Sequence, residues 1–191
     1  MTAASASGRG LVLADLVPGA RARDAVLVLV GAGLTGLAAQ VSIHTALSPV
    51  PFTLQTLSVL VVGGALGSLR AALSILIYLL AGVAGVPWFE QHTHGWGGPS
   101  FGYILGFVVA AGVVGALAER ARDRDFVSTL GVMFLGTAIV YVIGAVWLAY
   151  DLHVSASKAI SLGVTPFLVT DALKVVVAAI AFPAAWRLAR R

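Results

Sequence analysis

The sequence predicts an all-α membrane protein, a bundle of six transmembrane helices with both ends of the chain in the cytoplasm. Hydrophobic residues make up 59% of the 191 residues and charged residues only 10%, and the mean hydropathy is +0.98. These values lie far outside the range of soluble domains. Apolar segments near the roughly 20 residues that span a bilayer recur along the chain. The basic residues between these segments fall almost entirely on one side.

Six apolar runs account for the predicted spans. The second run is short, and its glycine-rich tract, residues 63–67, predicts that this helix ends, tilts or breaks early. Residues 1–24 are small, polar and basic without a continuous apolar core, so we expect a cytoplasmic N-terminal segment and no cleavable signal peptide. The transmembrane domain then covers 25–187, and a basic cytoplasmic tail covers 188–191. The six predicted helices are 25–47, 53–67, 69–86, 100–118, 128–150 and 165–187.

The Lys and Arg positions set the orientation, because basic residues in short loops stay on the cytoplasmic side. With the N-terminus inside, ten of the 12 basic residues fall on inner segments, and Lys158 alone falls on an outer one. Lys174 lies within the last span. The even number of spans follows from this asymmetry. The basic residues are also too dispersed to form a nucleic-acid-binding face. The ten inner ones are Arg9, Arg21, Arg23, Arg70, Arg120, Arg122, Arg124, Arg187, Arg190 and Arg191.

Asp171 and Lys174 place a carboxylate and an ammonium inside an apolar segment. Each charge costs about 2.5–3.5 kcal/mol at the centre of a transmembrane helix, so such residues usually mark function. At a spacing of i and i+3 they share one helix face. With Thr165 as the N-cap, Asp171 lies roughly 9 Å and Lys174 roughly 13 Å below the outer start of the helix. We expect a pair that binds a ligand arriving from outside; the alternative is an ion pair that only fixes helix packing.

Other candidate site residues lie near the same outer level. Gln55 follows two prolines and places an amide in the first turn of the second helix, where it either binds ligand or meets headgroups. Trp88 and Trp96 belong to a long outer loop and either anchor it at the membrane interface or cover a ligand. Tyr103 follows in the fourth helix. Small residues four apart, Ala32 and Gly36, permit close helix packing within the chain or with a partner.

Two further patterns suggest catalysis or metal binding, but we consider both weaker predictions than a ligand-binding site. Residues 98–102 match the serine-hydrolase pattern G-x-S-x-G around Ser100, but that pattern needs a strand-to-helix elbow, whereas here it opens a membrane helix. Glu90, His92 and His94 can form a metal site only with a further ligand that the loop does not supply. The chain has no cysteine and no Walker-type phosphate loop. We therefore expect no metal, no cofactor and no catalysis by this chain.

Three motifs in this order resemble the BioY family of biotin-specific membrane subunits: residues 49–56 (PVPFTLQT), 102–107 (GYILGF) and 171–174 (DALK). The resemblance covers residues 26–187. It implies biotin capture from outside and uptake across a bacterial cell membrane as the substrate-binding (S) subunit of an energy-coupling-factor (ECF) transporter. The implied partners are a transmembrane coupling subunit, two ATP-binding subunits, further copies of the chain and membrane lipid.

By matching the family's motifs, the resemblance implies that Asp171, Lys174 and Gln55 bind biotin. Asp171 suits a ureido N–H, while Lys174 suits the ureido carbonyl or the carboxylate. Aromatic walls would come from Tyr103, Trp96 and Trp88, and the coupling contact from Ala32 and Gly36. The outer loop departs from the family pattern: residues 90–94 (EQHTH) stand where a glycine-rich sequence is expected, and the chain has no asparagine to supply a loop amide. Alternatives are another vitamin, such as thiamine or riboflavin, and an intramembrane serine hydrolase.

Overall fold

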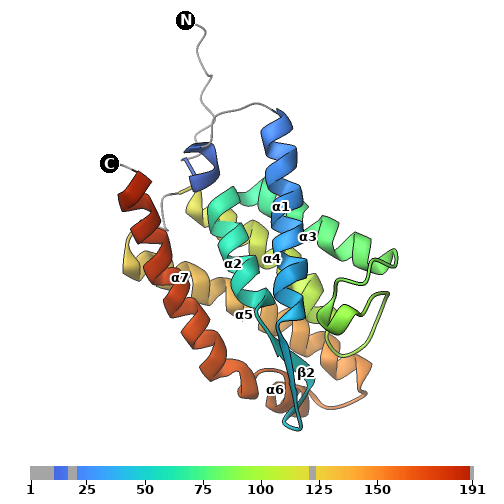
Figure 1. Ribbon diagram of the computed structural model, residues 1–191. Coiled ribbons are helices and arrows are strands. Elements are labelled where there is room, and N and C mark those ends of the chain that lie inside the picture. Colours follow the sequence, from blue (N-terminus) through green and yellow to red (C-terminus); the bar gives the residue numbers. More distant parts are fainter. Residues whose placement is uncertain (1–10, 17–20, 121–123, 190–191) are drawn as a thin grey trace, which may run out of the picture.

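The computed structural model describes residues 11–16, 21–120 and 124–189, and it is helical apart from one β-hairpin (Figure 1). In the described part of the chain, α1, α4, α5 and the segment Ala156–Leu188 are long and apolar enough to cross a membrane, whereas α2 and α3 are shorter apolar helices. Three 3-10 turns are η1 (Leu13–Leu16), η2 (Glu90–His92) and η3 (Thr165–Phe167). The helices are α1 (Arg21–Gln40), α2 (Gln55–Leu66), α3 (Ser68–Val83), α4 (Phe101–Ala118), α5 (Phe126–Asp151), α6 (Ala156–Gly163) and α7 (Leu168–Ala189).

Each of the six predicted ranges contains a helix, and five of these begin and end within three residues of the predicted bounds. The second helix is short, as predicted: α2 stops at Leu66, because Gly67 takes a positive φ of 80° that favours glycine. The start predicted at Thr165 is wrong by three residues. Residues 165–167 form η3 instead, and the Thr165 hydroxyl donates to the Ile160 carbonyl rather than capping α7.

The first predicted helix, 25–47, is wrong at its C-terminal end. The structure ends α1 at Gln40 and continues into an antiparallel hairpin of β1 (Ser42–Thr45) and β2 (Ser48–Thr53), in which Ile43 faces Phe52. β-Branched residues alternate in this stretch, a pattern that favours strand over helix. The two prolines before Thr53 lie in β2, where the chain is extended. The short helix α6 was not predicted.

The centre of the bundle is α4, which packs against α2, α3 and α5. Its glycines allow these close contacts: a Cβ at Gly115 would collide with the backbone of Gly67 and Ser68, and one at Gly106 would press on the backbone of Val140. The buried face of α4 is almost wholly apolar. Burial of this face is the main source of packing in the core.

The two ends of the bundle differ (Figure 1). The start of α1 and the end of α7 lie at one end, while the hairpin, α6 and the loop after α3 lie at the other. Part of the predicted N-terminal segment folds onto the first of these ends, since Val12 and Ala14 are buried there. Arg70 holds this end together by pairing with Asp15 at 2.8 Å and with Asp24 at 3.4 Å. Residues 1–10, 17–20 and 190–191, which include half of the predicted tail, lie outside the described residues.

Candidate functional site

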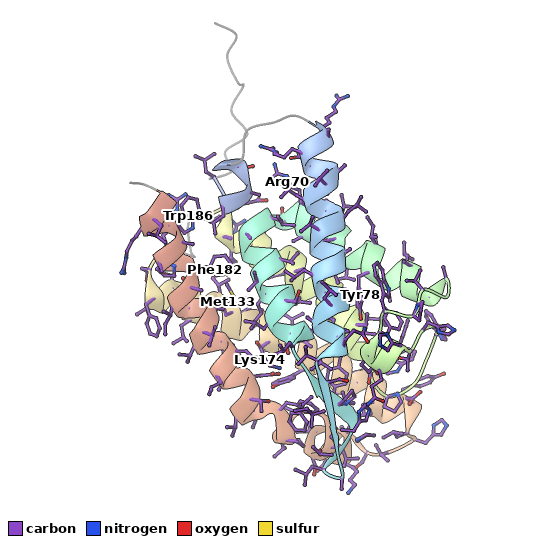
Figure 2. The ribbon with its side chains drawn as sticks, viewed as in Figure 1. Arg70, Tyr78, Met133, Lys174, Phe182 and Trp186 are labelled. Carbon is purple, nitrogen blue, oxygen red and sulfur yellow. The ribbon has the colours of Figure 1, made fainter. Side chains whose placement is uncertain are left out.

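The site is built around Asp171 and Lys174 near the start of α7. Lys174 Nζ lies 2.6 Å from Asp171 Oδ1, and only 12% and 5% of the two side chains are exposed. Because α7 begins at Leu168, Asp171 and Lys174 lie about 4.5 Å and 9 Å along the helix from its first residue. Figure 2 shows Lys174 on α7 near the base of α2, at the opposite end of the bundle from Arg70. The expected intramembrane ion pair is therefore present and buried.

Lys174 is bound by the residues that join the hairpin to α2. Its ammonium donates to the Thr53 carbonyl at 2.7 Å and to Thr56 Oγ1 at 2.9 Å, besides Asp171. Three acceptors satisfy the three protons of an ammonium. The prolines of β2 position this carbonyl, because they keep the chain extended until α2 begins at Gln55.

The Asp171 carboxylate also has several partners. Tyr141 of α5 donates its hydroxyl to Oδ2 at 2.8 Å, and Thr56 donates to Oδ1 at 3.4 Å. Three helices, α2, α5 and α7, thus converge on one carboxylate. Its remaining lone pair on Oδ2 is available to one further donor, such as a ligand N–H.

A cavity borders this pair, and it brings together four of the predicted ligand residues: Asp171, Lys174, Gln55 and Tyr103. Its walls are otherwise mostly apolar, with a few convergent polar groups, which is the usual construction of a small-molecule site. The remaining lining residues are Val50, Pro51, Thr53, Thr56, Glu90, Ser100, Ile104, Phe107, Val140, Tyr141 and Phe167.

Gln55 and Tyr103 both reach the cavity with their polar groups already engaged. Gln55 is buried, its Nε2 donates to the Tyr78 hydroxyl at 2.7 Å, and its Oε1 accepts from Thr53. The Tyr103 hydroxyl donates a hydrogen bond to the Gly163 carbonyl at 2.8 Å. Tyr103 therefore lines the cavity with its ring and not with its hydroxyl. Gln55 retains one N–H and one lone pair for a ligand.

The structure places the two predicted tryptophans away from this cavity. Trp88 packs on Tyr78 and donates its indole N–H to the Tyr78 carbonyl at 2.8 Å. Trp96, in the loop after α3, is 71% exposed and packs against the Phe101 ring with the two planes tilted by 50°. Neither belongs to the residues that line the cavity. Trp88 therefore shapes the site indirectly, through the residues it packs against.

Ala32 and Gly36, the predicted partner contacts, lie on the buried face of α1. Ala32 is 1% exposed, and a Cβ on Gly36 would touch the Trp88 ring at 3.2 Å. Both positions thus permit close packing within this chain. Elsewhere on α1, Leu29, Leu34 and Leu37 are exposed.

The hydrolase and metal patterns find no supporting geometry. Ser100 occupies the position before α4, but its side chain caps nothing and, within the described residues, bonds to no histidine. No group of three His, Asp or Glu side chains among the described residues lies close enough to hold a metal.

The cavity is also lined by five polar residues that the sequence did not assign to a ligand: Thr53, Thr56, Glu90, Ser100 and Tyr141. Thr53 and Thr56 flank Gln55, so the same motif could have indicated them. Tyr141 lies inside an apolar span, where a hydroxyl needs a hydrogen-bond partner. This need for a partner could have marked Tyr141 as a candidate site residue.

Comparisons with known proteins identify the relatives of the chain. The model of the BioY family matches residues 9–191. The biotin transporter BioY of Thermotoga maritima is 39% identical over 137 residues, which cover 70% of this chain and 79% of that relative. A probable biotin transporter BioY of Pyrococcus horikoshii is 37% identical over 163 residues, which cover 84% of this chain and 94% of that relative.

A solved structure supports the same fold. The crystal structure of the S-component for biotin from an ECF-type ABC transporter matches with a TM-score of 0.79 at 19% identity, over 90% of this chain and 93% of that one. The family match extends over nearly the whole sequence and includes all three motifs found in it. The chain therefore belongs to the BioY family.

Proposed function

We propose that the protein binds biotin from the outer side of a bacterial cell membrane with high affinity and mediates its uptake as the S subunit of an ECF-type transporter. The observation that carries this proposal is the buried pair Asp171–Lys174 beside an outer cavity in a chain of the BioY family. The named relatives are biotin transporters, and the chain covers most of their length.

The chemistry of the cavity supports a ligand with a polar head and apolar rings. The ureido group of biotin offers two N–H donors and one carbonyl acceptor. The free lone pair of Asp171 and the free groups of Gln55 match these, while Phe107, Phe167 and the ring of Tyr103 offer apolar walls. A ligand that adds bonds to groups already held in place loses little to reorganisation.

The proposed topology has six spans, α1 to α5 and α7, with both termini in the cytoplasm. The domain 25–187 would carry the site, and segments 1–24 and 188–191 would lie inside. The distribution of basic residues supports this orientation. It puts the hairpin, α6 and the cavity on the outer side.

ATP hydrolysis would belong to partner subunits, two ATP-binding subunits and a transmembrane coupling subunit. The sequence contains no Walker motif of its own. Ala32 and Gly36 would then act by bringing α1 close to its neighbours, so that its exposed face presents a regular surface to a partner.

Direct binding measurements on the purified protein test the proposal. Asp171→Asn and Lys174→Met each remove a charged hydrogen bond, so we expect biotin affinity to fall by roughly tenfold to a hundredfold. The matched controls Asp151→Asn and Lys158→Met remove the same charges outside the cavity and should bind like the parent. Wild-type biotin affinity in both Asp171→Asn and Lys174→Met would contradict the proposed binding site. Displacement of biotin by thiamine or riboflavin would point to a different vitamin.

A further inference from the structure

Glu90 occupies the junction between two hollows on the outer side. The first is the cavity beside Asp171. The second, which we call the vestibule, lies between the hairpin and the loop after α3 and includes His44, Pro49, Thr93 and His94. Both hollows share Glu90, Pro51, Ser100 and Ile104. These four shared residues, which we call the neck, border both hollows.

The backbone around Glu90 is held in an unusual conformation. Gln91 and His92 have positive φ values of 53° and 59°, which non-glycine residues rarely adopt. Thr93 closes the turn with two hydrogen bonds to the Glu90 carbonyl, from its backbone N–H at 3.1 Å and its hydroxyl at 2.8 Å. Strained residues of this kind persist only where surrounding contacts fix them, and they cluster at ligand-contacting sites.

Contacts from α1 and the hairpin fix this turn. Gln40, the last residue of α1, donates to the Trp88 and Phe89 carbonyls and accepts from the His92 N–H at 3.1 Å. His44 of β1 bonds the Gln91 amide at 3.0 Å. The position of Glu90 at the neck is therefore specified by the fold.

Glu90 also differs electrostatically from the acid at the bottom of the cavity. Asp171 is compensated by Lys174 at 2.6 Å, whereas in the described part of the chain no hydrogen bond or ion pair reaches the Glu90 carboxylate. With all three groups ionised, the path from vestibule to cavity carries one net negative charge, located at the neck.

We propose that Glu90 is a specificity-determining residue that senses the charge of the ligand tail. This inference rests on the proposed function and deepens it. The ureido head pairs with the free groups of Asp171 and Gln55 at the bottom of the cavity, so the flexible acid arm of biotin points to the neck. There the Glu90 carboxylate repels the tail carboxylate and weakens binding of the anion relative to a ligand with an uncharged tail.

The experiment compares biotin with its uncharged amide on the purified protein by calorimetry. In the parent, the amide binds more tightly than biotin by roughly five- to tenfold, the effect of two unit charges at a hydrated neck. Glu90→Gln keeps the side-chain shape, tightens biotin by a similar factor and leaves the amide unchanged. Glu90→Asp keeps the charge and therefore keeps the preference for the amide. Asp151→Asn, which removes a charge away from the neck, changes neither ligand.

Salt gives a second readout. Because ions screen exposed charges over about 8 Å at physiological ionic strength, high salt reduces the difference between biotin and the amide in the parent but not in Glu90→Gln. Two results overturn the inference: Glu90→Gln weakens both ligands equally, which makes Glu90 an acceptor for the head, or it changes neither. Failure of both ligands to bind the parent would instead overturn the proposed function.

Discussion

The carboxylate of Asp171 shows how one residue can be made ready for a ligand. Burying an ion pair is unfavourable unless both partners are fully hydrogen-bonded. Here Lys174, Thr56 and Tyr141 supply the donors from three helices. Asp171 and Tyr141 also line a groove between α5 and α7, so the hydrogen bond between them separates the cavity from that groove. Tyr141 thus orients the carboxylate toward the cavity.

Removal of the Tyr141 hydroxyl tests this orientation. In Tyr141→Phe, Oδ2 of Asp171 loses its donor while the ring remains, so we expect biotin binding to weaken by roughly tenfold, the value of a hydrogen bond to a charged group. Isothermal titration calorimetry measures the change. Tyr150→Phe, on the exposed outer part of the same helix, serves as the control and should bind like the parent. Equal affinity in Tyr141→Phe would show that Asp171 needs no help from α5.

At the residue scale, the sequence identifies charged site residues more readily than it identifies their hydrogen-bond partners. Asp171 and Lys174 could be identified because a charged residue in an apolar span is energetically costly and therefore usually has a functional role. Tyr141 and Thr56 gave much weaker signals, because a hydroxyl in a membrane helix costs far less than a charge and often bonds its own backbone. Their partners lie 30 and 115 residues away, a relation that only the folded chain reveals.

At the scale of elements, two glycines decide how the aromatic wall of the cavity is positioned. Gly144 of α5 lies directly against the Tyr103 ring, and Gly163 at the end of α6 accepts the hydroxyl of the same residue. A Cβ on either glycine would collide with Tyr103. The two glycines therefore let Tyr103 lie close against α5 and α6 at the wall of the cavity.

A methyl group at Gly144 should close part of the cavity. In Gly144→Ala the Tyr103 ring has to move away from α5, and we expect biotin affinity to fall by at least tenfold together with a loss of stability of about 1–3 kcal/mol from overpacking. Gly131→Ala on the same helix faces open space and should leave both unchanged or slightly raise stability. Thermal unfolding and calorimetry measure the two effects. Similar behaviour of the two variants would contradict this account of the wall.

The elements that sequence reasoning missed are those of the outer rim. Apolar content alone extended the first helix through residues 41–47, although β-branched residues alternate there and the structure forms β1. The short helix α6 has too few residues to give a membrane-span signal. Long apolar runs fix the bundle helices, whereas the rim depends on contacts such as that of Gln40 with the loop after α3. The part of the site on the bundle helices could therefore be predicted, whereas the part formed by the hairpin, α6 and the loop after α3 could not.

At the scale of the whole molecule, the two ends of the bundle have different chemistry. One end carries the network of Arg70 with Asp15 and Asp24, onto which residues 11–16 fold. The other end carries the hairpin, α6, the strained turn at Glu90 and the cavity. If the basic end is cytoplasmic, the cavity opens to the side from which a scarce vitamin arrives.

Cysteine labelling tests this orientation directly, because the chain contains no cysteine of its own. Lys158 in α6 and Arg120 after α4 are both exposed and lie on opposite sides of the span formed by α5. We expect a membrane-impermeant maleimide to label Lys158→Cys in intact cells and Arg120→Cys only after permeabilisation, since basic loops are retained inside. The cysteine-free parent is the control for background. Labelling of Arg120→Cys in intact cells would invert the topology, and it would place the Asp171 cavity on the cytoplasmic side, where it could not capture a ligand from outside.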